Sequence, residues 1–534
     1  MSTADCYPIT IMPGLSRLFI DFCAGTEPAP SFIPVSTNWH ERPPLPPHWP
    51  EICRVLTEQN PSASAASALA ALGAGAGTVV TGQQAGLFGG TMLVPLKAAT
   101  ALGHARNASA SGKPHVAVFW LASEDHDFAE INHVSLPSGR ELEKLEYPLP
   151  AEGTPAVPVG RIVLNEQVNG LITKACELLG PSDAAEALAA AYRPGQTFAQ
   201  AFANFYRQVF AAQGLLVLDA SSREVHRIGA PILRAAIERA DEFNHALLER
   251  NQHLEAAGYH AQVAVAEHSS LLFLIDETTG ARIALRRTSA NSAEPNSIWQ
   301  ADGKSYSTAD LIGILETSPE RISPSALLRP VFQDFLLGTS LVLGGPAEIA
   351  YFGQSVVLYE RILGRRTPAA PRQFASLIEP HIGKLLNRHE LGLEQVFGQD
   401  NGSLALRLAA RSMPPETKQK LAAAGNAVDT ELKTLVDWMQ SQDKGLGQSA
   451  ETAAGKIMYQ MSRLRTLAAN FQLQRESTFA RHAESICTAL FPNGAPQERI
   501  HGAAYYFARY GIELAERLTA HAQDCCPGHA AIWL

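Results

Sequence analysis

The residues with the clearest capacity for chemistry form a short acidic segment, Ser123-Glu-Asp-His-Asp127. Glu124, Asp125, His126 and Asp127 place three carboxylates and one imidazole in consecutive positions. Groups crowded in this way shift one another's pKa values and suit general acid–base catalysis, recognition of an amine, or binding of a metal ion. A structural alternative is open, because acidic residues at the start of a helix complement its dipole. The segment is a candidate catalytic site.

A loop rich in glycine and glutamine precedes this segment, Gly82-Gln-Gln-Ala-Gly-Leu-Phe-Gly-Gly90. Glycines such as Gly86 let backbone amides approach a ligand at the start of the following helix, which favours anions. Gln83 and Gln84 add uncharged donors and acceptors, so these three residues are candidates for substrate binding. The loop has neither the GK[ST] of a Walker A motif nor the GxGxxG pattern. A tight turn that requires glycine is the structural alternative.

Four further residues could complete a pocket with these loops. Asp219 directly follows an apolar run and could contact a substrate there. Arg329 could bind a substrate carboxylate through two parallel hydrogen bonds. Glu348 and Tyr351 lie about one helical turn apart and could face the same pocket. Each also has a structural explanation, such as a helix cap for Asp219.

These candidates fall where apolar strands are expected to end. Buried-strand patterns cover residues 78–81, 116–122, 215–218 and 339–343, and helical patterns lie between them. Continuous apolar strands that alternate with helices are typical of a parallel sheet covered on both faces. In such a doubly wound sheet, ligands bind beyond the carboxyl ends of the strands. We therefore predict an α/β fold with a Rossmann-like core and a pocket at that edge.

Two segments interrupt this alternation, and the last third of the chain differs from it. Residues 140–196 predict a helical insertion, and residues 261–322 predict an insertion with a β-hairpin. Apolar residues repeat at spacings of three and four on both sides of residues 442–448, which indicates an antiparallel helical coiled coil. Its expected role is oligomerisation or a rigid arm. The predicted domains are core segments 1–139, 197–260 and 323–395, the insertions 140–196 and 261–322, and a C-terminal coiled-coil domain, 396–534.

Composition argues against several classes of protein. The 534 residues carry a formal net charge of −9, which argues against a general nucleic-acid binder. No apolar stretch approaches the length of a membrane-spanning helix and no secretory signal is evident, so we expect a cytoplasmic protein without a membrane partner. The seven cysteines are scattered and form no CxxC pair. They predict reduced thiols, with neither a disulfide framework nor a structural zinc site.

Taken together, several motifs resemble the cysteine-adding enzymes of bacillithiol biosynthesis. The two most specific are Thr81-Gly-Gln-Gln-Ala-Gly-Leu-Phe-Gly-Gly90 and Phe119-Trp-Leu-Ala-Ser-Glu-Asp-His-Asp127. The supporting motifs are Ile322-Ser-Pro324, Leu328-Arg-Pro330, Gly345-Pro-Ala-Glu-Ile-Ala-Tyr351, Leu490-Phe-Pro-Asn-Gly494 and Gln497-Glu-Arg499. The match extends from about residue 80 to residue 511.

The resemblance implies a Rossmann-like core, distantly related to class I aminoacyl-tRNA synthetases, and a coiled coil that supports a homodimer. The implied substrates are cysteine and glucosaminyl-malate, joined as an amide at the glucosamine amine. His126, oriented by Asp125 or Asp127, would take the proton from the attacking amine. Gln83 and Gln84 would orient anionic groups of the substrate.

Amide formation needs an activated carboxylate, usually supplied through ATP, and the resemblance implies nucleotide binding near the C-terminus. ATP or ADP is therefore the expected cofactor, and the dependence on a metal stays open. The candidate residues for the nucleotide are Pro492, Asn493, Gly494, Gln497 and Arg499. The chain lacks HxGH, KMSKS and Walker A motifs, so the alternative function is a non-catalytic dimeric scaffold that binds a nucleotide or metabolite.

Overall fold

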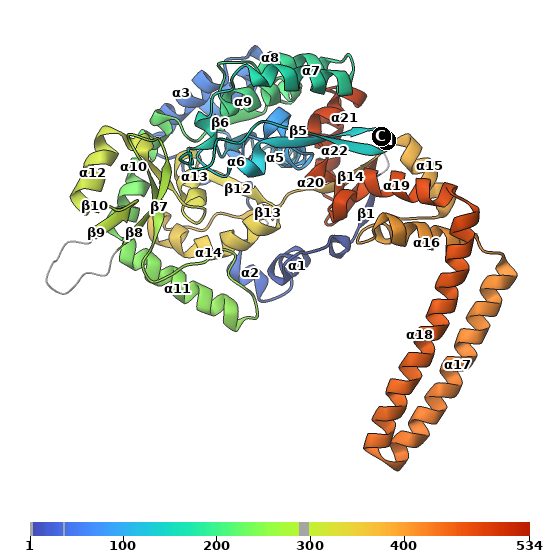
Figure 1. Cartoon of the computed structure of the whole chain (residues 1–534). Helices are drawn as coiled ribbons and strands as arrows, with labels where there is room; N and C mark the ends of the chain where they lie inside the picture. The colour runs from blue at the N-terminus through green and yellow to red at the C-terminus, as the bar shows by residue number, and fades with distance from the viewer. Residues whose placement is uncertain (1–3, 36–37, 288–297) are drawn as a thin grey trace. The chain divides into compact units, whose positions relative to one another are not determined.

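The computed structural model describes residues 4–35, 38–287 and 298–534, which divide into two compact units (Figure 1). The first unit comprises the chain up to Ser376 together with Glu498–Ile532. The second comprises Leu377–Gln497 and the last two residues. The predicted C-terminal domain, residues 396–534, therefore falls partly in each unit.

A five-stranded parallel sheet forms the centre of the first unit. Its strand order is β13 (Ala369–Pro371), β12 (Thr339–Gly344), β2 (Gly77–Gln83), β3 (His115–Leu121) and β6 (Leu216–Asp219). β3 and β12 are buried throughout and β2 over most of its length, which explains the continuous apolar runs that predict them. The predicted Rossmann-like parallel core is confirmed.

The winding of the chain reverses within this sheet. α5 (Leu93–Ala110) connects β2 to β3, and α14 (Pro346–Leu363) follows β12 on the other side of β2. Pro346 occupies the first turn of α14, where its fixed φ suits a helix, and Gly364 ends α14 in the left-handed conformation. The reversal lies between β2 and β12, and such a switch point is where doubly wound sheets bind ligands.

Two insertions extend the first unit. The first carries a hairpin and two helices, β4 (His133–Ser138), β5 (Glu141–Glu146), α7 (Gln167–Leu179) and α8 (Asp183–Ala191). The second forms an antiparallel sheet of order β10-β9-β8-β7-β11, in which β7 (Ser269–Ile275) and β8 (Arg282–Arg287) are the predicted hairpin. The sequence misses β9 (Ile298–Ala301), β10 (Lys304–Ser307) and β11 (Ile322–Pro324), because strands of three or four residues are too short to show a pattern.

The remaining helices of the first unit lie between its strands along the chain, and polar side chains cap some of them. Ser222 caps α10 with a hydrogen bond from the amide of Val225. Thr197 caps α9 in the same way. These helices are α1 (Arg17–Ala24), α2 (Ala29–Phe32), α3 (Trp49–Gln59), α4 (Ala66–Gly73), α6 (Phe128–Ile131), α9 (Phe198–Val209), α10 (Arg223–Glu238), α11 (Ala240–Ala256), α12 (Thr308–Thr317), α13 (Arg329–Leu337), α20 (Gln497–Ile500), α21 (Ala503–Tyr510) and α22 (Leu514–Gln523).

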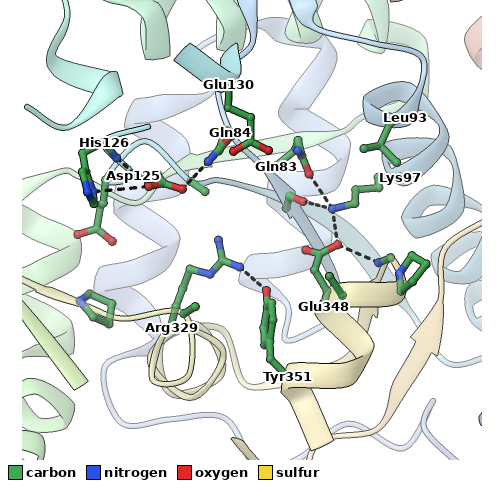
Figure 2. Close-up of a pocket in the computed structure, with 18 of the residues that line it drawn as sticks. Gln83, Gln84, Leu93, Lys97, Asp125, His126, Glu130, Arg329, Glu348 and Tyr351 are labelled. Atoms are coloured by element: carbon green, nitrogen blue, oxygen red, sulfur yellow. Dashed lines mark hydrogen bonds and ion pairs between the residues drawn. The ribbon is translucent and has the colours of Figure 1, made fainter. Parts of the chain in front are cut away.

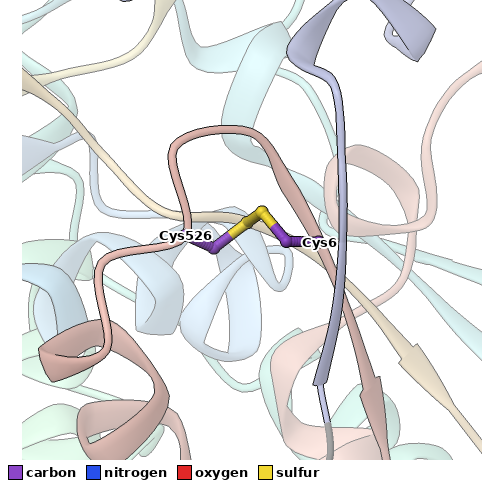
Figure 3. Close-up of a disulfide and its surroundings, with 2 residues drawn as sticks. All are labelled: Cys6 and Cys526. Atoms are coloured by element: carbon purple, nitrogen blue, oxygen red, sulfur yellow. A yellow bond between two sulfur atoms is a disulfide. The ribbon is translucent and has the colours of Figure 1, made fainter.

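The prediction of reduced cysteines is wrong for one pair, because Cys6 and Cys526 form a disulfide (Figure 3). β1 (Ala4–Tyr7) pairs antiparallel with β15 (His529–Trp533) in a small sheet that also contains β14 (Phe374–Ile378). This pairing brings together two cysteines that are 520 residues apart. Local sequence carries no trace of such a contact. The other cysteines, Cys23, Cys53, Cys176, Cys487 and Cys525, are free.

The second unit is helical. α16 (Asn401–Ser412) packs against α19 (Thr478–Leu490), and α15 (Pro380–His389) also contacts α19. α17 (Pro415–Gln442) and α18 (Lys444–Arg475) run antiparallel as a long hairpin (Figure 1). The predicted coiled coil is confirmed. Within the described ranges of both units, every helix is too short or too polar to cross a bilayer.

Candidate functional site

A cavity of about 460 Å³ lies at the carboxyl ends of β2, β3, β12 and β13. Its walls come from the loops after these strands, from α13 and α14, and from the second insertion (Figure 2). The sequence-predicted residues that line it are Gln83, Gln84, Glu124, Asp125, His126, Arg329, Glu348, Tyr351 and Arg499. The fold thus brings several separate candidate segments together at the switch point of the sheet.

A buried lysine occupies one side of the cavity. The Lys97 ammonium donates to the Glu348 carboxylate at 2.5 Å, to Gln83 Oε1 at 2.8 Å and to the carbonyl of Gly82 at 2.7 Å. Glu348 also accepts a hydrogen bond from the Gly345 amide at 2.8 Å. Burial lowers the pKa of Lys97, although the charge of Glu348 opposes this. The ammonium therefore fixes Glu348 and Gln83 in the cavity wall.

The acidic segment occupies the opposite side (Figure 2). The Asp125 carboxylate accepts hydrogen bonds from the Gln84 side-chain amide and from the backbone amide of His126. Burial works against the charged form, but these hydrogen bonds and the positive charge of Arg282 outweigh it and lower the pKa of Asp125. Asp125 is therefore ionised at neutral pH and presents a negative charge to the cavity.

His126 is not oriented as the sequence predicts. Its Nδ1 lies 3.7 Å from Asp125 Oδ1, beyond hydrogen-bond distance, and 3.2 Å from Arg282 Nη1. A guanidinium has no acceptor, so Arg282 donates, Nδ1 accepts, and the ring proton lies on Nε2. Burial, reinforced by Arg282, lowers the pKa of His126, which keeps the ring neutral. In this arrangement Nε2 presents an N–H rather than the basic nitrogen that the predicted mechanism needs.

Arg282→Met is expected to raise the pKa of His126 toward its ordinary value. The substitution removes a positive charge that disfavours the imidazolium. NMR titration of the histidine rings in the folded protein measures the change. Arg286→Met is the matched control, because Arg286 lies on the same strand and is exposed. An unchanged His126 titration in Arg282→Met would show that burial alone lowers the pKa.

Glu124 lines the cavity, but a histidine behind it engages its carboxylate. Glu124 Oε1 lies 2.7 Å from His226 Nε2, and the other nitrogen of this fully buried ring lies 2.9 Å from the carbonyl of Ile322. Burial opposes a charge on His226, but Glu124 and the backbone carbonyls outweigh it and raise the pKa of His226. The pair fixes the acidic segment to α10. Glu124 thus has a structural partner in addition to its place in the cavity wall.

Two other predicted carboxylates have structural roles. Asp127 caps α6 by accepting a hydrogen bond from the amide of Glu130 at 3.2 Å. For Asp127, the structural alternative given for the acidic segment therefore applies. Asp219 accepts hydrogen bonds from the hydroxyls of Ser123 and Ser221, and its carboxylate fixes two strand-end loops. In the described ranges, histidine, cysteine and acidic side chains do not gather in groups of three that could hold a metal ion.

The glycine-rich loop uses part of its backbone amides within the fold. The amides of Gly86, Gly89 and Gly90 each donate to a partner inside the first unit, which for Gly89 is the Tyr192 hydroxyl at 2.8 Å. These three amides fit the structural alternative of a tight turn, and ligand binding by the loop stays a prediction. Gly86 lines an adjoining cavity of about 220 Å³, to which Gln84 also contributes.

The predicted nucleotide-binding residues fall in different units. Arg499 lines the cavity of the first unit. Gln497 belongs to the second unit, where its side-chain amide is hydrogen bonded to the backbone of Leu377 and Ala489. The side-chain amide of Gln497 therefore stabilises the local fold of the second unit. Pro492, Asn493 and Gly494 form a turn in the same unit, with Asn493 in the left-handed conformation.

Three guanidinium groups line the cavity without a salt bridge in the described part of the chain, although nearby carboxylates act on them through space. Arg329 donates to the Tyr351 hydroxyl, and Arg282 donates to His126 and to the Pro324 carbonyl. Neither these two guanidinium groups nor that of Arg499 forms an ion pair with a carboxylate in the described part of the chain. Burial raises the pKa of Tyr351 to about 12, so its hydroxyl keeps its proton. A ligand with several carboxylates would supply the missing partners.

Comparison with known proteins identifies the family. Residues 45–373 match the family described as bacillithiol biosynthesis BshC, N-terminal Rossmann-like domain, and residues 375–532 match the corresponding C-terminal coiled-coil domain. The chain belongs to the BshC family. A BshC of Koribacter versatilis, named as a candidate cysteine ligase, is 38% identical over 540 residues, covering 99% of both chains. BshC proteins so named in Solibacter usitatus and Salinibacter ruber are 36% and 30% identical, covering 89% and 82% of this chain and 87% and 80% of their own.

Sequence reasoning missed several cavity residues of this BshC family member. Lys97 is one of them, although a lone lysine among the buried positions of an apolar helix is a visible signal. Arg282 lies on the inserted hairpin, far along the chain from its partner His126. Arg372 directly follows β13, a strand of three residues that is too short to show a pattern, and Glu130 lies on α6 just after the acidic segment. Arg282, Arg372 and Glu130 become functional candidates through the tertiary fold.

Proposed function

We propose that this chain is a ligase of bacillithiol biosynthesis that joins cysteine to the amine of glucosaminyl-malate. The observation that carries the proposal is the set of guanidinium groups of Arg282, Arg329 and Arg499, which face one cavity without carboxylate partners. Malate carries a carboxylate at each end, and these two groups match the guanidinium groups of Arg282 and Arg329. The names of the relatives give the class of reaction. The reaction is placed in the cytoplasm, which supplies cysteine and ATP.

The opposite wall of the cavity carries carboxylates that match the amino groups of the two substrates. Asp125 presents a negative charge there, and the exposed Glu130 carboxylate lies on the same rim. Asp125 holds the ammonium group of a substrate, and Glu130 takes the proton that the attacking amine loses. The Nε2–H of His126 donates to the carboxyl oxygen of cysteine as negative charge develops on it. His126 is thus proposed as a donor rather than as the base.

We further propose that ATP activates the cysteine carboxylate. Among the candidate nucleotide-binding residues, Arg499 supports this role, because its guanidinium group lines the cavity and forms no salt bridge in the described part of the chain. Gln497 has its side-chain amide committed to the backbone of its own unit. The phosphates would therefore contact Arg499, and the ligation should depend on added ATP.

The experiment is reconstitution with the purified full-length chain, glucosaminyl-malate and cysteine, with and without ATP. Mass spectrometry should detect the amide product only in the complete mixture. Deletion of the gene in its native host should abolish bacillithiol and accumulate glucosaminyl-malate. No product in vitro, together with an unchanged thiol pool in a host that makes bacillithiol and has no second copy, would overturn the proposal and favour the scaffold alternative.

We also propose a homodimer through the coiled-coil hairpin. Large apolar side chains on α17 and α18 are between 45% and 59% exposed, namely Leu435, Trp438, Ile457, Leu464, Leu467 and Phe471. Ile457, Leu464 and Phe471 recur every seven residues, as on the packed face of a coiled coil. An apolar stripe of this kind marks an interaction surface, and a second copy carries the matching stripe.

Leu464→Glu combined with Phe471→Glu is expected to convert the dimer to a monomer, because it places charges in the apolar contact. Light scattering coupled to size-exclusion chromatography measures the mass. Ser462→Glu adds a charge at an exposed position of the same helix, two residues from Leu464 and so on another face, and should leave the dimer intact. A double variant with unchanged mass would place the dimer interface, if one forms, elsewhere.

A further inference from the structure

A second cavity, of about 200 Å³, is lined in part by Cys526. Figure 3 shows the disulfide that this residue forms with Cys6. One wall comes from the N-terminal segment and includes Ile9 and Cys23. Another wall is the segment 525–528, which contains Cys526 itself. Because the disulfide joins the N-terminal segment to this second segment, it ties two walls of one cavity together.

The cavity contains a polar side chain without a partner. Gln373 is 7% exposed, and neither its Oε1 nor its Nε2 has a hydrogen-bond partner in the described part of the chain. A buried amide without a partner costs free energy, so a polar molecule in the cavity would satisfy it. A volume of about 200 Å³ suits a molecule of the size of an amino acid.

Free cysteines distinguish this cavity from the others. Cys23 and Cys525 line it together with Cys526. Burial raises the pKa of Cys23 to about 12 and also raises the pKa of Cys525. Both therefore stay protonated at neutral pH, whereas disulfide exchange requires a thiolate. The neighbouring cysteines leave the disulfide intact, and opening it requires a thiolate from outside the chain.

We propose that this cavity is a thiol-exchange site, where a low-molecular-weight aminothiol such as cysteine opens the Cys6–Cys526 disulfide. The thiolate of the small molecule attacks Sγ of Cys526, the protein S–S bond breaks, and Cys6 leaves as a thiolate that takes a proton from water. A second small thiolate attacks the mixed disulfide and releases Cys526. Two small thiols are oxidised to their disulfide, and one protein disulfide is reduced to two thiols.

The site shares one lining residue with the candidate ligase cavity. Arg372 lines both cavities, and its Nη1 donates to the carbonyl of Gln373 at 2.7 Å. β1 is an edge strand that pairs with β15 alone in the described sheet, so the disulfide is its covalent tie. Release of Cys6 removes the covalent link between two walls of the cavity that shares Arg372, and in this proposal the redox state of the small-thiol pool acts on the neighbouring cavity through that residue.

The test is alkylation of the native full-length chain in buffers of defined cysteine and cystine content, followed by mass spectrometry. We expect Cys6 and Cys526 to be protected in the oxidised buffer and alkylated in the reduced one, with a cysteinyl adduct on Cys526 as the intermediate. Gln373→Leu should slow exchange with cysteine about tenfold and leave exchange with 2-mercaptoethanol, which lacks the charged groups, unchanged. Cys176→Ser, whose thiol lies elsewhere, is the control and should change neither rate.

Three outcomes would overturn the proposal. The first is alkylation of Cys6 and Cys526 in the oxidised buffer as fast as that of the free thiol of Cys53. The second is a disulfide that small thiols open only in denaturant. The third is equal slowing of both thiols by Gln373→Leu in a variant whose thermal unfolding matches the parent. The assay detects no ligase product, so its failure and a failure of the proposed function are separate results.

Discussion

Glu498→Gln is expected to lower the free energy of unfolding of the first unit by about 3–5 kcal/mol. The Arg372 and Glu498 side chains are 0% exposed and form a paired contact, with 3.0 Å between Nη1 and Oε2. Glu498 also accepts a hydrogen bond from the amide of Ala375 at 3.2 Å. The substitution leaves the guanidinium charge buried without its counter-charge, so the cost of desolvating that charge is no longer offset.

The same pair makes stability depend on pH. Burial opposes the Glu498 carboxylate, but Arg372 outweighs it and lowers the pKa of Glu498 below the ordinary value of 4.5. Because the pKa of Glu498 is lower in the folded state than in the unfolded state, its ionised carboxylate stabilises the fold. This stabilisation is complete at pH values above the unfolded-state pKa. This contribution is lost as the pH falls from 4.5 through the lower folded-state pKa. In Glu498→Gln this part of the acid sensitivity should be absent, which urea unfolding at a series of pH values measures.

A surface pair gives the matched control. Arg106 and Glu516 lie 2.6 Å apart with side chains 31% and 51% exposed. Glu516→Gln should therefore cost less than about 1 kcal/mol, because solvent already screens the pair. Equal losses in Glu516→Gln and Glu498→Gln would contradict the view that burial makes the Arg372–Glu498 pair important.

Lys97→Met is expected to lower kcat/KM of the proposed ligation by about 100- to 1000-fold. The Lys97 side chain is 2% exposed, and its ammonium holds Gln83 and Glu348 in the cavity wall. Without it, the Glu348 carboxylate loses its counter-charge and the positions of both side chains are no longer fixed. Steady-state assay of the reconstituted reaction measures the loss.

Two comparisons separate a catalytic effect from a loss of fold. Lys97→Met combined with Glu348→Gln removes both charges and should recover stability without recovering activity. Lys144→Met removes an exposed lysine and should keep both stability and activity, since Lys144 pairs with Glu146 at the surface. Full activity of Lys97→Met would exclude this side of the cavity from the mechanism.

The sequence predicts the core because the core obeys local rules. Residues 116–122 form a continuous apolar run because β3 is buried on both faces, and Pro346 and Gly364 mark the ends of α14. The coiled coil is equally visible from its repeat. By contrast, the pairing of β1 with β15 depends on residues at opposite ends of the chain, and no local pattern predicts it.

The candidate site also contains residues that the sequence predicts and partners that it does not predict. Gln83, Asp125 and Glu348 follow strand ends, so the rule for doubly wound sheets predicts that they meet. Their partners are not visible locally, because Arg282 reaches His126 from an insertion and Lys97 reaches Glu348 from another crossover helix. The expected orientation of His126 failed for this reason, since Arg282, and not a neighbouring carboxylate, contacts its Nδ1.

The pairing of β1 with β15 also constrains when the protein can mature on the ribosome. Ala4–Tyr7 leave the exit tunnel long before their partner residues, since Cys6 and Cys526 in the two strands' segments are 520 residues apart. Throughout synthesis the first strand exposes unsatisfied amides and carbonyls, together with the thiol of Cys6, to other nascent chains. A truncated polypeptide that stops before β15 never acquires this partner. The pairing of β1 therefore forms only after the residues of β15 have been synthesised.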